Sequence, residues 1–185
     1  MSFDAIRDRI FPWIKAKIAD SPNGDDGEAV PVDLVVRDFL ADLIITYAVD
    51  EGDRFSLLQR NDVPEDIGPD ELYALACKNM ADQVEFNFTG TNYGGYGILA
   101  GGDHEAGALC LDFIWDFCAR EIGKDLVIAV PAKDCLFMAV AEDAEQVEAM
   151  KAISRDIFEH GERTLTSALL LFHADTRDFS VYGTF

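Results

Sequence analysis

Asp103 and His104 are the residues best placed for chemistry, because they follow Gly101 and Gly102 where a strand should lead into a helix. An imidazole beside a carboxylate could serve a hydrolase-type enzyme as a general base. The other interpretation is structural, with Asp103 capping the helix through the unpaired amides of its first turn. A phosphate site is disfavoured, since Asp103 and Glu105 would repel the anion and no GxGxxG or GxxxxGK[ST] pattern is present. The sequence favours the capping role.

A run of tyrosine, glycine and asparagine at residues 92–97 forms the second candidate site. Asn92, Tyr93 and Tyr96 could present a contact surface at a hairpin tip, because tyrosine supplies large contact area with few rotatable bonds. The alternative is a turn in which Gly94 and Gly95 supply positive φ and the tyrosines pack back on the sheet. The turn interpretation is favoured.

Metal and cofactor sites are not supported by the spacing of ligand residues. The three histidines and four cysteines form no HExxH, HxH or CxxC pattern, and the carboxylates lack the spacing of a calcium loop. We therefore expect no metal and no cofactor. We expect reduced, buried thiols at all four cysteines, which are Cys77, Cys110, Cys118 and Cys135.

The net charge of the chain limits the classes of partner that it is expected to bind. With 15 basic and 35 acidic residues, the formal net charge is −20 and the isoelectric point is near 4.2. Such a surface repels nucleic acid and anionic membranes, whereas a basic protein partner or simple solubility is compatible with it. No apolar run approaches the ~18 residues of a membrane span, and the first residues resemble no signal peptide. We therefore expect a cytoplasmic location.

Hydrophobic periodicity predicts one α+β domain over residues 1–185. An N-terminal helix within residues 1–19, kinked or restarted at Pro12, is followed by an exposed loop at 20–29 and an α+β core at 30–185. In the core, an antiparallel sheet should arise from successive β-hairpins that alternate with helices, about four helices in all. The expected strands are 30–36, 43–49, 55–58, 84–88, 96–100, 126–130, 136–140, 167–173 and 179–182, and the expected core helices are 69–83, 103–121 and 147–161. The helix at 103–121 should place Phe113 and Phe117 in the core.

Several of these segments resemble the YtpQ-like family of bacterial proteins. The resemblance spans residues 41–185 in the same order of elements, and the first 40 residues depart from it. It is carried by Tyr47-Ala48-Val49-Asp50-Glu51-Gly52, Phe55-Ser56-Leu57, Ala76, Asn79, Asp103 and Ala129-Val130-Pro131-Ala132-Lys133-Asp134-Cys135-Leu136. The resemblance implies a bacterial cytosolic protein of this fold class, and it carries over no catalytic residue.

The absence of a catalytic constellation favours a non-enzymatic cytosolic binding or adaptor protein. One alternative is an acidic chaperone-like protein for a basic partner, similar in overall character to small secretion chaperones, which is an analogy at the level of the fold. The other is the hydrolase-type enzyme that would use Asp103 and His104. A binding protein needs an exposed apolar patch or groove, whereas an enzyme needs a pocket with converging polar groups.

Overall fold

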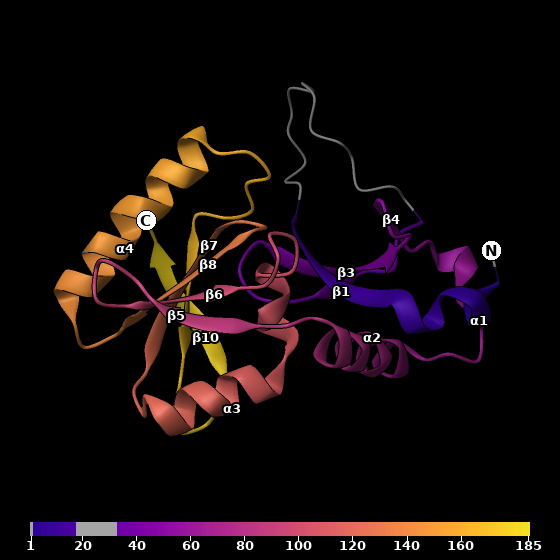
Figure 1. Ribbon diagram of the computed structural model, residues 1–185, viewed down its shortest axis with the longest axis horizontal. Coiled ribbons are helices and arrows are strands. Elements are labelled where there is room, and N and C mark those ends of the chain that lie inside the picture. Colours follow the sequence, from indigo (N-terminus) through magenta and orange to yellow (C-terminus); the bar gives the residue numbers. More distant parts are fainter. Residues whose placement is uncertain (1, 18–32) are drawn as a thin grey trace. The chain divides into compact units, whose positions relative to one another are not determined.

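The computed structural model describes residues 2–17 and 33–185, and its chain divides into two compact units (Figure 1). Unit 1 contains Met1–Phe39 and Leu43–Gln83, and unit 2 contains Leu40–Asp42 and Val84–Phe185. Every strand pairing within these units is antiparallel, which confirms the α+β class. The single-domain organisation stays a prediction. The exposed loop predicted at 20–29 lies outside the described residues.

Unit 1 is built on a small sheet with strand order β1-β3-β2, in which β4 also pairs with β3. The elements are α1 (Phe3–Ile6), the 3₁₀ helix η1 (Arg7–Arg9), β1 (Ile10–Ala16), β2 (Arg37–Asp38), β3 (Leu43–Asp50), β4 (Phe55–Leu57), η2 (Arg60–Asp62) and α2 (Pro69–Gln83). The hairpin β3–β4 and the helix α2 were both predicted. Of the strand predicted at 30–36, the described part contains an isolated bridge at Leu34, and the strand β2 begins only at Arg37.

The predicted N-terminal helix is wrong, because the chain is helical only to Arg9 and then forms β1. Ile10 to Ile14 are all buried, which is the signature of a strand covered on both faces rather than of one helical stripe. Pro12 fits there because β1 is an edge strand, where a residue without an N–H group is tolerated. Helix α2 packs on this strand, and the buried Asn79 amide donates to the carbonyl of Ile10 over 3.0 Å.

Unit 2 is built on a six-stranded sheet with strand order β10-β9-β7-β8-β6-β5. Its strands form the three predicted hairpins, and the predicted central pair β7–β8 lies in the middle. The strand predicted at 84–88 begins only at Asn87. The elements are β5 (Asn87–Gly90), β6 (Tyr96–Leu99), η3 (Ala106–Cys110), α3 (Asp112–Glu121), β7 (Leu126–Ala132), β8 (Cys135–Val140), α4 (Ala144–His160), β9 (Ala168–Phe172) and β10 (Phe179–Thr184).

The helix predicted at 103–121 is shorter than expected, and Asp103 does not cap it. Helix α3 begins at Asp112, after the 3₁₀ helix η3, and no side chain caps its N-terminus. The buried carboxylate of Glu105 instead binds the loop that precedes η3, since its Oε1 accepts from the amides of Ala100 and Gly102, both at 2.8 Å. These bonds fold residues 100–105 into a compact loop, which takes the place of the first turns of the predicted helix.

Helices α3 and α4 cover opposite faces of the six-stranded sheet (Figure 1). Successive side chains of a strand point to opposite faces of the sheet. On one face, Val127 of β7 packs with Met150 of α4. On the other face, the Trp115 ring of α3 lies 5.2 Å from Phe172 and 5.0 Å from Phe179, measured between ring centroids. Each helix therefore seals a separate layer of the core.

Candidate functional site

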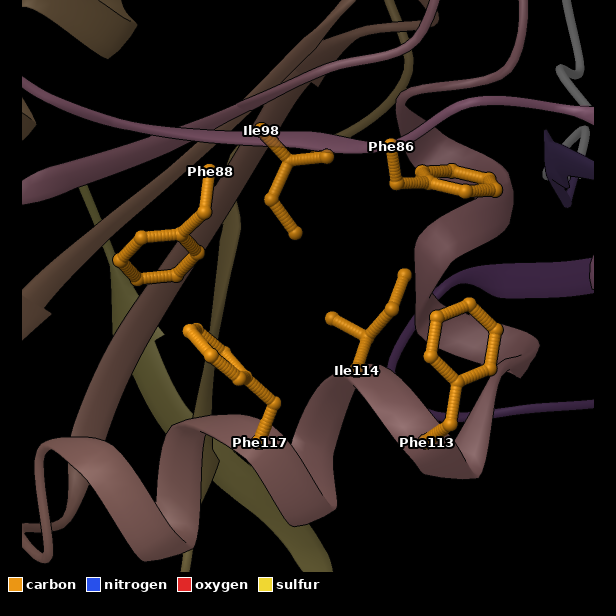
Figure 2. Close-up of a pocket in the computed structure, with 6 residues that line it drawn as sticks. All are labelled: Phe86, Phe88, Ile98, Phe113, Ile114 and Phe117. Carbon is orange, nitrogen blue, oxygen red and sulfur yellow. The ribbon is translucent and has the colours of Figure 1, made fainter.

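An apolar pocket opens between α3 and the strands β5 and β6 of unit 2 (Figure 2). Figure 2 shows six side chains pointing toward one hollow, with Phe113, Ile114 and Phe117 rising from α3 and the others descending from the strand side. The pocket volume is about 210 Å³. Its lining consists of Phe86, Phe88, Ile98, Phe113, Ile114 and Phe117.

Local periodicity places these aromatic side chains. Phe86 and Phe88 are two residues apart along an extended segment, so both point to the α3 side of the sheet. Phe113 and Phe117 are four residues apart on α3 and lie on one stripe of the helix. The sequence shows both repeats and predicts a core position for Phe113 and Phe117 and a strand for Phe86 and Phe88, but it predicts none of the six lining residues as a site.

The pocket is walled by aromatic pairs that remain partly exposed. The rings of Phe86 and Phe113 lie 6.4 Å apart and those of Phe88 and Phe117 lie 5.5 Å apart, both in edge-to-face geometry. Phe113 is nevertheless 50% exposed and Phe117 is 38% exposed, contrary to their predicted core position. Exposed large apolar side chains that cluster around a hollow are typical of interaction sites.

The size and chemistry of the lining limit what the pocket can hold. Small-molecule sites usually exceed about 300 Å³ and contain a few polar groups that orient the ligand. A cavity of roughly 150 Å³ accommodates one benzene ring. Because the six lining side chains are phenylalanine and isoleucine, they offer no hydrogen bond to a ligand. The pocket therefore suits one or two apolar side chains better than a polar metabolite.

Acidic residues flank the pocket at its Phe86–Phe113 end. Glu85 precedes Phe86 and Asp112 precedes Phe113, both exposed, and neither forms an ion pair with another described residue. At the other end, the guanidinium of Arg120 lies 5.8 Å from the centroid of the Phe117 ring and is paired with Glu121. The Phe86–Phe113 end thus carries uncompensated negative charge.

The structure places Asp103 and His104 in a polar loop away from this pocket's lining. The Asp103 carboxylate accepts from the guanidinium of Arg163 at 2.6 Å, and Arg163 also donates to the carbonyl of Gly102. His104 is half-buried beside Glu105, which is 2% exposed. Because Arg163 holds the Asp103 carboxylate, the geometry gives this pair a loop-fixing role rather than an open acid–base site.

The tyrosine-rich hairpin tip packs back on the sheet. The Tyr93 hydroxyl lies 3.1 Å from the carbonyl of Met138, and burial raises the pKa of this phenol. Gly94 has a positive φ as predicted, whereas Gly95 does not. Gly95 is required for another reason, because an added Cβ would collide with the Tyr93 ring and the Met138 carbonyl. Tyr96 contacts Phe88 with ring centroids 5.1 Å apart, and Asn92 is exposed. This placement favours the turn interpretation over a contact surface.

A serine, a histidine and an aspartate of unit 2 lie in a row: Ser180 belongs to β10, His173 directly follows β9, and Asp125 directly precedes β7. His173 Nε2 lies 2.9 Å from the Ser180 hydroxyl, and His173 Nδ1 lies 3.5 Å from Asp125 Oδ2. The order of these groups matches the nucleophile, base and orienting acid of a hydrolase. Asp125 also accepts from the amide of Ala174 through Oδ1, which fixes the turn after β9. Sequence spacing could not reveal this row, because the three residues meet only through strand pairing.

Metal ligands and thiols add no further site in the described chain. Residues 2–17 and 33–185 contain no group of three or more His, Cys, Asp or Glu that could hold a metal ion. All four cysteines are free thiols, of which Cys110 and Cys118 are buried and Cys77 and Cys135 half-buried. Burial raises the pKa of Cys118 to about 11. Burial, with the nearby carboxylates of Asp134 and Glu105, raises the pKa of Cys135 to about 12.

Unit 1 also has a hollow, of about 460 Å³, beside the segment between η2 and α2. Its lining mixes charged, amide and apolar residues, and most of them belong to irregular backbone: Val35, Arg60, Asn61, Val63, Pro64, Glu65, Ile67, Pro69 and Leu72. A site on rigid elements holds its geometry better than one on loops. The aromatic pocket of unit 2 is therefore the stronger candidate.

Comparisons with protein-family models, curated proteins and solved structures find no match to this chain. The resemblance to the YtpQ-like family therefore stays a prediction. Within the described residues, none of the helices has the length and apolar character that a bilayer crossing requires.

Proposed function

We propose that this protein is a binding protein whose aromatic pocket receives an apolar side chain from a basic partner protein. The observation that carries the proposal is the exposed pocket between α3 and β5–β6, with Phe113 half exposed at its wall. Interface hot spots are typically aromatic or apolar anchors that fill such hollows. An adaptor and a chaperone for a basic client both use a surface of this kind.

Charge supports a basic partner. Unit 2 carries 18 acidic and seven basic side chains, a formal charge of −11, so a positively charged segment is drawn toward it. Glu85 and Asp112 lie next in sequence to two of the pocket phenylalanines and are free to pair with lysine or arginine of the partner. An anchor residue with a basic neighbour would satisfy both features.

Selection from a phage-displayed library of random 12-residue peptides tests the proposal with the full chain as target. We expect the enriched peptides to share one aromatic or long aliphatic residue next to lysine or arginine. The best peptide should bind Phe117→Ala at least about tenfold more weakly, equivalent to about 1.4 kcal/mol of lost anchor contact. Its association rate should fall as sodium chloride rises, because salt screens the steering field.

Val181→Ala is the matched control, because Val181 is 54% exposed and lies on β10 at the opposite edge of the same sheet. Peptide binding to this variant should stay within about twofold of the unmodified protein. The proposal fails if no peptide is enriched, or if the enriched peptides bind Phe117→Ala as tightly as Val181→Ala.

A second candidate function is ester hydrolysis, and the 2.9 Å contact between His173 and Ser180 favours it. Ser180 would attack an ester carbonyl while His173 takes the hydroxyl proton and passes it to the leaving alcohol. Water would then release the acid from the acyl-serine and restore the serine hydroxyl. The enzymatic alternative thus moves from Asp103 and His104 to this row of residues.

Labelling with a fluorophosphonate probe tests the second candidate. Probe attached to the native chain, and lost in both Ser180→Ala and His173→Gln, would support acyl transfer. Equal labelling of native protein and Ser180→Ala, or none above that of heat-denatured protein, would leave the row as a structural polar ladder.

A further inference from the structure

Strand β5 leaves one edge of the six-stranded sheet open beside the aromatic pocket. It is the last strand of the order β10-β9-β7-β8-β6-β5, and no described strand pairs with its outer edge. Phe88 belongs to β5 and lines the pocket, so the open edge and the pocket are continuous. A sheet edge is a template for pairing with another chain.

The hydrogen-bond register defines which groups face outward. The Thr91 amide donates to the Gly95 carbonyl over 3.0 Å, and hydrogen-bonded pairs alternate along an antiparallel ladder. Thr89 therefore bonds with its partner Gly97, whereas Phe88 and Gly90 direct their N–H and C=O groups away from β6. The backbone of the pocket residue Phe88 is thus presented to an incoming strand.

The two edges of the sheet differ in protection. The β10 edge is interrupted by a bulge between Val181 and Gly183, a common device against unwanted pairing. The β5 edge, with the sequence Asn87-Phe88-Thr89-Gly90, has a regular register with no bulge, no proline and no charge. A second copy of the chain is a poor occupant, because two surfaces of −11 would repel each other.

We propose that a basic, extended segment of the partner adds as a strand to the outer edge of β5 and places its anchor beside Phe88 in the aromatic pocket. The inference rests on the proposed function and specifies how the partner binds. A residue paired opposite Phe88 has its side chain on the same face of the sheet, about 5 Å away, which is the pocket side. Main-chain bonds supply affinity, and the pocket and the acidic flank supply specificity.

Substitution at Gly90 isolates the strand-pairing step. Gly90 lies outside the left-handed region, and a Cβ added there meets no atom within 4 Å. Gly90→Pro removes an outward N–H group without breaking a bond to β6, and proline is tolerated at such edge positions. Gly90→Ala keeps that N–H group and is the matched control.

With the best library peptide, Gly90→Pro should bind at least about fivefold more weakly than Gly90→Ala, because one backbone hydrogen bond is lost and the ring obstructs the approach. Gly90→Ala should stay within about twofold of the unmodified chain. Amide exchange on the unmodified chain gives a measurement that needs no variant: peptide should slow exchange at Phe88 and Gly90 by at least about tenfold and leave Thr89 unchanged.

The inference is overturned, with the proposed function intact, if Phe117→Ala weakens binding while Gly90→Pro binds like Gly90→Ala and exchange at Phe88 is unchanged. A helix lying in the groove would give that result. If Phe117→Ala also binds normally, or if no peptide is selected, both proposals fail. A dimer in sedimentation that dissociates in Gly90→Pro would assign the edge to a second copy and overturn the inference as well.

Discussion

Helices α3 and α4 cover the same sheet from opposite faces, yet they use their apolar residues differently. In α4, the described large apolar side chains are all at least half-buried, and the Asp143 carboxylate caps its N-terminus by accepting from the amide of Gln146 at 3.0 Å. In α3, no side chain caps the N-terminus, and Phe113 and Phe117 are exposed around a hollow. Core packing accounts for the large apolar side chains of α4, but it does not account for Phe113 and Phe117 of α3.

The apolar residues of α3 also differ from one another in burial. Ile114, Trp115 and Cys118 are buried against the sheet, and the Trp115 indole donates to the carbonyl of Ala108 over 2.9 Å. These buried residues anchor the helix to the sheet, whereas the two phenylalanines contact the rings of Phe86 and Phe88 and stay partly exposed. One stripe of α3 is therefore structural, and the neighbouring stripe is available for binding.

The largest expected effect follows from truncating the structural stripe. Trp115→Ala should lower the free energy of unfolding by about 3 to 5 kcal/mol, because it removes a buried ring that contacts Phe172 and Phe179. Urea denaturation monitored by far-UV circular dichroism measures this loss. A cost below about 1 kcal/mol would mean that this stripe does not hold α3, and the division of the helix would be wrong.

Truncating the exposed stripe should cost less. Phe113→Ala should lower the free energy of unfolding by about 1 to 2 kcal/mol, since the Phe113 side chain is only half-buried. The same urea titration, run beside Trp115→Ala, gives the comparison directly. If both variants lost the same stability, Phe113 would be a core residue and the binding role of its stripe would lose its basis.

Much of the fold could be predicted where the signals were local. Pro69 opens α2, the turn at Gly52 separates β3 from β4, and the apolar runs at 126–130 and 136–140 form the central hairpin. The N-terminal helix was wrong because a long-range contact decides that segment. Ile10 to Ala16 pair with Leu43–Asp50, which no window of neighbouring residues reveals.

The site was harder to predict for the same physical reason. Helical periodicity placed Phe113 and Phe117 on an apolar stripe, but which part of a stripe faces the sheet depends on where the strands lie. Strand pairing, invisible in the sequence, brings Ile98 and Phe88 over α3 and leaves the hollow. Asp103 was misassigned because the buried Glu105 carboxylate, rather than an exposed one, binds the local amides.

The helix caps give a smaller, matched contrast. Asp143→Ala should lower the free energy of unfolding by about 0.5 to 2 kcal/mol, the usual cost of a lost N-cap. Asp103→Ala should cost about 1 kcal/mol or less, because it removes a partly exposed ion pair with Arg163. Thermal unfolding of the two variants in one buffer measures both. If Asp103→Ala were less stable than Asp143→Ala, Asp103 would have a structural role as large as that of a helix cap.

The smallest effect concerns the thiol of Cys118, which lies on the buried stripe of α3. Burial raises the pKa of Cys118 to about 11, so this thiol should stay protonated at pH 8 and react with iodoacetamide far more slowly than free cysteine does. An unfolded chain releases the Cys118 proton near pH 9, whereas the folded chain keeps it until about pH 11. The free energy of unfolding should therefore fall as the pH rises from about 9 toward 11. Mass spectrometry of native protein should find Cys118 unmodified when denatured protein is labelled at all four cysteines. Rapid native labelling of Cys118 would mean that α3 opens readily, and its buried stripe would then be no more structural than the exposed one.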